Sequence, residues 1–113
     1  MNGILASTKK LAQLSEDYDV FDPQIVMYIN SVFLVLKQLG VGPSEGFFIT
    51  EDDDALWKDF IPDNAVLRES VKAYMGSKVR LQFDPPQSSA HLEALKAIIN
   101  EFEWRLCAEA ETV

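Results

Sequence analysis

The chain has 113 residues, 48% of them hydrophobic, so it is long enough for one domain with its own core and too short for two. Its 18 acidic and 10 basic residues give a formal net charge of -8. Such a surface repels nucleic-acid phosphates, which argues against direct binding of DNA. The single cysteine, Cys107, excludes an internal disulfide. No secretory pattern opens the chain, so a cytosolic compartment is expected.

The first predicted element is a weakly amphipathic helix over residues 4–14. Because helices at chain termini are often poorly tied down, we assign residues 1–16 to an N-terminal segment that can be mobile. Residues 17–111 are predicted to form a single helical domain.

The next predicted helix runs from Pro23 to Gly40, with Asp22 as its N-cap. It carries too many polar residues for a membrane span, so we expect it to be buried. Met27 and Leu34 project from the side opposite its core face, which indicates contacts on two sides. The core face comprises Ile25, Ile29, Val32, Phe33, Leu36 and Leu39.

The sequence GFFIT, residues 46–50, is short, aromatic and β-branched, which predicts one isolated strand. A lone strand needs a partner, so it is expected to pair within a small hairpin or with another subunit. Phe47, Phe48 and Ile49 are therefore candidate docking residues. A purely local hairpin is the alternative.

Acidic residues then open a predicted short helix, with Thr50 or Asp52 as its cap. The following helix is predicted to start at a cap on Asp63. Gly76 lies inside it at a cost of about 1 kcal/mol relative to alanine, so it either permits a close approach of another backbone or is simply tolerated. The predicted core stripe of this helix comprises Leu67, Val71, Tyr74, Met75, Val79, Leu81 and Phe83.

The stretch RLQFDPPQSS separates this helix from the last one. Pro85 cannot continue a helix, and Ser88 or Ser89 is a good cap for the next. Asp84, Pro85 and Pro86 are therefore predicted to form a rigid corner that sets the angle between the two helices.

The last predicted helix ends near Ala110 and carries two apolar faces. Its inward face is predicted to comprise Leu92, Leu95, Ile98, Ile99, Phe102 and Leu106. On the far side, Ala90, Ala97, Trp104 and Ala108 form a second stripe of small residues around one large aromatic.

An isolated domain would have little use for that second stripe, so Trp104 with Ala97 and Ala108 is predicted to contact another subunit. The alternative is that the N-terminal helix of the same chain covers Trp104. Arg80 and Arg105 are candidates for bridges to acids on a neighbouring protomer, with ordinary surface pairs as the alternative.

No combination of residues predicts catalysis. His91 has no cysteine or serine partner at a suggestive spacing, so we expect a surface or boundary role. Cys107 is expected to be a packing residue, because Glu103 and Glu111 at helical spacing disfavour a thiolate. We expect no enzymatic activity and no cofactor.

Two acidic runs raise the question of a metal site. Asp17 and Asp19 alternate as in a calcium loop, but its sixth position is not glycine, and Tyr28 stands where an EF-hand has glutamate. The run EDDD, residues 51–54, is explained by a solvated helix start. No metal is expected. The fold class is therefore mainly α, a small bundle of four to five helices with one short strand or hairpin around residues 46–50.

Several stretches together resemble a known family. They are AYMGSKVRLQFDPPQSSAHLEALKAIINEFEWRLCAEAE, MYINSVFLVLKQLGVG, and GFFIT followed by ALWKDF. Over roughly residues 17–111 the chain resembles the head-to-tail connector proteins of long-tailed bacteriophages, the adaptor or head-completion family. The N-terminal residues lie outside this resemblance.

The resemblance implies a structural virion protein without catalysis. Such proteins form a ring, usually twelve-fold, beneath the portal protein at the capsid vertex. The ring receives the next connector or tail-completion protein and lines a channel through which DNA passes without specific binding. The implied location is the head-to-tail interface of the virion, after assembly in the host cytoplasm, with no membrane involved.

A second function stays open beside the connector. An acidic helical module could bind one partner protein, as a chaperone-like regulator or as an inhibitor that mimics DNA. A connector should form rings, whereas such a module should stay monomeric or dimeric and bind its partner one-to-one.

Overall fold

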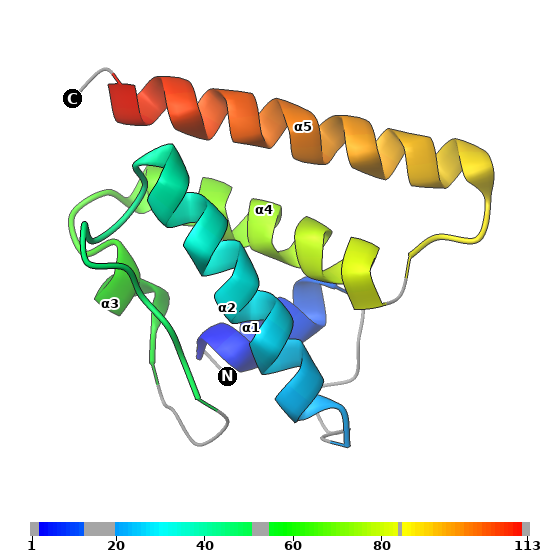
Figure 1. Cartoon of the computed structure of the whole chain (residues 1–113), viewed down its shortest axis with the longest axis horizontal. Helices are drawn as coiled ribbons and strands as arrows, with labels where there is room; N and C mark the ends of the chain where they lie inside the picture. The colour runs from blue at the N-terminus through cyan, green and yellow to red at the C-terminus, as the bar shows by residue number, and fades with distance from the viewer. Residues whose placement is uncertain (1–2, 13–19, 51–54, 84, 112–113) are drawn as a thin grey trace.

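The structure is a computed structural model that describes residues 3–12, 20–50, 55–83 and 85–111. Within these ranges the mainly helical fold class is confirmed (Figure 1). The five helices are α1 (Ile4–Leu11), α2 (Asp22–Leu39), α3 (Trp57–Phe60), α4 (Ala65–Phe83) and α5 (Ser89–Glu111).

Helix α4 is the centre of the bundle, since α1, α2, α3 and α5 all pack against it. Helix α5 lies along one edge of the molecule, across α4 and the end of α2 (Figure 1). The predicted stripe on α4 faces these neighbours. Its buried members are Val71, Tyr74, Met75 and Val79, while Leu67, Leu81 and Phe83 pack partly buried against the core.

The N-terminal helix is part of the packed core. Ile4 and Thr8 are fully buried, and the indole Nε1 of Trp57 donates a hydrogen bond of 2.7 Å to Ser7 Oγ. A Cβ added at Gly76 would lie 2.7 Å from the Cβ of Leu11. The close approach predicted at Gly76 is thus present, and α1 is the helix that approaches. The domain boundary after residue 16 stays a prediction.

Two predicted helix caps are wrong by one residue. Helix α2 starts at Asp22, so the capping position is Phe21. The Asp22 carboxylate instead forms an ion pair with Lys9, in which Nζ and Oδ1 are 2.8 Å apart. Helix α4 is capped by Asn64, whose Oδ1 accepts the Leu67 N–H at 3.0 Å, and not by Asp63. Asp and Asn are both good capping residues, so residue type alone does not distinguish Asp63 from Asn64.

Two other helix ends agree with the sequence. Gly40 has a left-handed φ of 87° and ends α2, with the Val41 N–H donating back to the Leu36 carbonyl. The Oγ of Ser88 accepts the His91 N–H at 3.4 Å, which makes it the cap of α5.

The predicted short helix starts later than expected. Helix α3 begins at Trp57, and the Asp59 carboxylate accepts the Leu56 N–H at 2.8 Å. Thr50 is therefore not its cap, and Asp52 lies outside the described residues.

The strand predicted at residues 46–50 does not form a ladder. Instead, the side-chain amide of Asn30 pairs with the backbone of Ile49. Its Nδ2 donates to the Ile49 carbonyl at 2.9 Å, and its Oδ1 accepts the Ile49 N–H at 2.8 Å. Both backbone groups of Ile49 point to one amide, as they do in extended backbone. One side chain thus takes the place of a partner strand.

Helix α5 buries less than its sequence indicates. Among its described side chains, only Ile99 and Leu106 are buried, while Leu92, Leu95 and Phe102 are half-buried. Ile98, predicted to face inward, is 46% exposed. At roughly 100° per residue it lies well to the side of Ile99, beyond the width of the contact with α4.

Candidate interaction surfaces

The outer face of α5 carries the largest exposed aromatic. Trp104 is 72% exposed, with Ala97 exposed and Ala108 half-buried on the same side of the helix. The alternative in which the N-terminal helix covers Trp104 is wrong, because α1 packs on α4. The role of these three residues in subunit contact stays a prediction.

The two candidate arginines differ in their surroundings. Arg105 donates from Nη2 and Nε to Glu101 Oε1 at 2.9 and 3.2 Å, a pair one turn apart on the exposed side of α5. The Nε of Arg80 is buried and has no hydrogen-bond partner in the part of the chain that the structure describes. Bridges from either arginine to a neighbour stay predictions.

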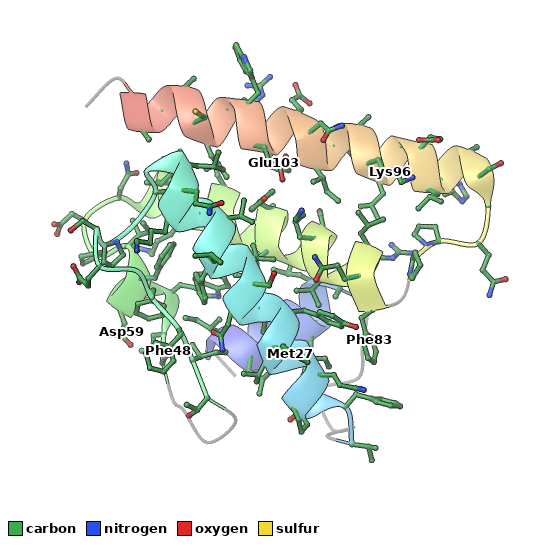
Figure 2. All side chains as sticks on the ribbon, in the orientation of Figure 1. Met27, Phe48, Asp59, Phe83, Lys96 and Glu103 are labelled. Atoms are coloured by element: carbon green, nitrogen blue, oxygen red, sulfur yellow. The ribbon has the colours of Figure 1, made fainter. Side chains whose placement is uncertain are left out.

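A second apolar surface lies on α2 and the adjoining segment. Met27 and Leu34 are exposed on α2, and Phe48 is 71% exposed beside it; Met27 and Phe48 are labelled in Figure 2. Leu34 and Phe48 line a hollow of about 410 Å³, together with Asn30, Phe33, Lys37, Glu45, Gly46 and Phe47.

Only one of the three predicted docking residues is largely exposed, namely Phe48. Phe47 packs edge-on against Phe33 and Phe60, with ring centres 5.1 and 5.3 Å away. Ile49 is buried, with 2% of its surface exposed. Phe47 and Ile49 therefore anchor the segment, and Phe48 is the side chain that it presents.

The predicted corner between α4 and α5 is only partly described. Pro85 is exposed and Pro86 half-buried, whereas Asp84 lies outside the described residues. Just before the corner, the ring of Phe83 packs against Phe21 and Tyr28 at 5.3 and 6.3 Å. The end of α4 is thus tied to the start of α2.

One polar contact joins α4 to α5. The Tyr74 hydroxyl donates a 2.7 Å hydrogen bond to Glu103 Oε2, and Lys78 Nζ lies 3.5 Å from the same oxygen. Glu103 is labelled on α5 in Figure 2. Burial, the hydrogen bond to Glu103 and the carboxylate charge all raise the pKa of the Tyr74 phenol above its ordinary value. We did not predict this contact, although a tyrosine on a core stripe signals the need for a polar partner.

A groove runs between the start of α4 and the end of α5. It consists of two hollows of about 220 and 360 Å³ that share Asn64, Leu67, Leu106 and Glu109. Val66, at its edge, is 79% exposed. No local pattern indicates this groove, because its walls are about forty residues apart in the chain.

The residues considered for catalysis lie apart. His91 is exposed near the start of α5, and Cys107 is half-buried near its end. Across the described ranges there is no group of three or more His, Cys, Asp or Glu side chains placed to hold a metal ion. Nor is any helix in these ranges both long and apolar enough to cross a membrane.

The chain matches a known protein family. The family model described as phage connector protein matches residues 4–113. The match begins at Ile4, so it also includes α1, which lay outside the resemblance drawn from the sequence. Searches of the curated proteins and of the solved structures found no match.

Proposed function

Because the chain belongs to the phage connector protein family, a family of structural proteins, we propose that it forms a ring between the portal at the capsid vertex and the tail. The ring is assembled in the host cytoplasm and lines the channel through which DNA passes. The portal protein adjoins one side of the ring, and the next connector or tail-completion protein adjoins the other.

The observation that carries this proposal is the pair of exposed apolar surfaces on a chain of only 113 residues. Trp104 stands on the outer face of α5, and Met27, Leu34 and Phe48 form a second surface on α2 and the segment beside it. A single contact would need only one of these surfaces. A ring subunit held between two neighbours, and placed against another connector component, needs more than one.

The charge of the chain supports passage of DNA without binding. A formal net charge of -8 opposes the counterion-releasing phosphate contacts that hold DNA on a protein. Glu45, Asp59 and Asp63 are among the exposed acids of the chain. A channel lined by an acidic protein repels the duplex rather than retaining it.

The proposal is tested by mixing the purified chain with the portal protein encoded in the same phage genome. We expect light scattering to report a complex of many copies, and negative-stain images to contain rings seated on the portal. Complexes with one copy per partner, or no complex at all, would contradict the ring and favour the acidic regulatory module.

A further inference from the structure

We propose that Trp104 of one copy inserts into the groove between α4 and α5 of the next copy. This inference rests on the proposed ring and names the contact that would build it. The two hollows of the groove share Asn64, Leu67, Leu106 and Glu109, and the smaller one is also lined by Val66, Ser70, Phe102 and Arg105.

Trp104 is exposed and has small neighbours on its helix, so it is suited to insert into another surface. Its indole is 72% exposed, although tryptophan is among the residues that gain most from burial. The residues one turn after it and two turns before it are Ala108 and Ala97, whose side chains are too small to shield it. A neighbouring surface could therefore enclose most of the ring.

The groove suits an indole in both shape and chemistry. Leu67, Phe102 and Leu106 supply apolar walls, and the two connected hollows of about 220 and 360 Å³ leave room for a large side chain. A buried indole N–H also needs an acceptor. Asn64 and Glu109 line the groove and carry side-chain oxygens, and an amide oxygen that already caps a helix has a second lone pair.

One pair of opposite charges is available across the contact. Arg105 lines the groove together with Glu109, while Glu101 lies three residues before Trp104 on the exposed side of α5. Within one copy these two side chains pair with each other at 2.9 Å. Because both are exposed, Glu101 beside an inserted Trp104 can pair with Arg105 of the receiving copy. This exchange offsets part of the repulsion between two acidic chains.

The arrangement on α5 makes the contact directional. Leu106 and Phe102 are each two residues from Trp104, which places them about 200° around the helix from it. Trp104 therefore cannot reach the groove of its own chain. A copy that donates its tryptophan on one side keeps an empty groove on the other, so the contact is heterologous and continues from copy to copy. Such a contact closes into a ring when the rotation between copies permits.

The first test is sedimentation velocity of the isolated chain over a range of concentrations. We expect wild-type assemblies that grow with concentration, and Trp104→Ala to weaken them at least about tenfold, as for a central interface aromatic. Val20→Ala is the control, because Val20 is an exposed apolar side chain, 64% exposed, that belongs to neither of the two surfaces. Wild-type-like assembly of Trp104→Ala, or an equal loss in Val20→Ala, would overturn the proposal.

The second test asks whether the contact has a donating side, Trp104, and a receiving side, the groove. Val66→Glu puts a charge at the edge of the groove, at a residue that is 79% exposed and in the first turn of α4, where an acid suits the helix dipole. Ser70→Trp, which fills the groove, is a second variant of the same kind. Each is expected to be monomeric alone.

Mixing Trp104→Ala with Val66→Glu should then give dimers and nothing larger. One copy retains an intact groove and the other an intact tryptophan, so a single contact can form and cannot be continued. Mixtures that stay monomeric, or that build larger assemblies, would overturn the proposal. Circular dichroism of each variant checks that its helices are intact.

The same variants separate this inference from the proposed function. If the wild type assembles only on the portal, the comparison is made there, and rings of Trp104→Ala on the portal would overturn the inference while leaving the ring function standing. A wild type that assembles neither alone nor on the portal would overturn both.

Discussion

Helices α4 and α5 are both long and rich in apolar residues, but they occupy different positions in the fold. Helix α4 is surrounded by four other helices and buries Val71, Tyr74, Met75, Gly76 and Val79. Helix α5 is longer, yet Ile99 and Leu106 are its only buried side chains among those described. Burial is therefore set by place in the bundle rather than by composition, and the apolar residues left over on α5 point to contacts beyond the chain.

The largest expected effect contrasts one side chain from each helix. Met75→Ala should lower the free energy of unfolding by about 2–5 kcal/mol, because Met75 is fully buried and its removal leaves a cavity. Trp104→Ala removes a larger side chain but should change the free energy of unfolding by no more than about 0.5 kcal/mol, since Trp104 is exposed. Urea denaturation at low protein concentration measures both. Similar losses would mean that Trp104 is packed within its own chain.

A smaller effect is expected from exchanging glycine and alanine. Gly76→Ala should destabilise the protein by about 1–2 kcal/mol, because the added Cβ would lie 2.7 Å from that of Leu11 and the overpacking outweighs the gain in helix propensity. On exposed α5 the opposite exchange, Ala97→Gly, should cost about 1 kcal/mol by propensity alone. Thermal denaturation compares them. A stabilised Gly76→Ala protein would argue against the close contact of α1 and α4.

The contact between the two helices predicts a dependence on pH. Tyr74→Phe should lose about 1–2 kcal/mol at pH 7, since it removes a hydrogen bond to the Glu103 carboxylate. The raised pKa of Tyr74 favours the neutral phenol in the folded state. Above about pH 10 the unfolded phenol loses its proton while the folded one keeps it, so this contribution to wild-type stability falls as pH rises.

The phenylalanine variant lacks this contribution, so the two stability curves should approach each other as the pH rises above about 10. Urea denaturation at several pH values measures the difference. Parallel curves would contradict a phenol held neutral between α4 and α5.

The smallest effect on stability is expected at the corner that joins the two helices. Replacing Pro85 and Pro86 with alanine should leave helix content unchanged and cost less than about 1 kcal/mol, because the chain there is largely exposed. It should nevertheless impair ring assembly, since the angle of α5 would no longer be set. Circular dichroism and sedimentation on the portal measure the two properties, with Gln87→Ala as the control. Unchanged rings would mean that the corner is merely a turn.

Much of the bundle could be predicted from local pattern. The four-residue spacing on α4, the glycine that ends α2 and the serine that caps α5 are signals carried by neighbouring residues. The exposure of Met27, Leu34 and Trp104 followed from the same periodicity, because each lies opposite a core face. Spacing within a helix therefore indicated correctly that these three side chains face away from the core.

The remainder depended on residues far apart in the chain. No local rule indicates that the amide of Asn30 replaces a partner strand for Ile49, or that Trp57 bonds to Ser7. The sequence by itself determined the helices and their apolar faces, because backbone hydrogen bonding and periodicity act within a few residues. Only the tertiary structure decided which faces were covered and where the groove opened, because packing joins segments whose separation along the chain carries no pattern.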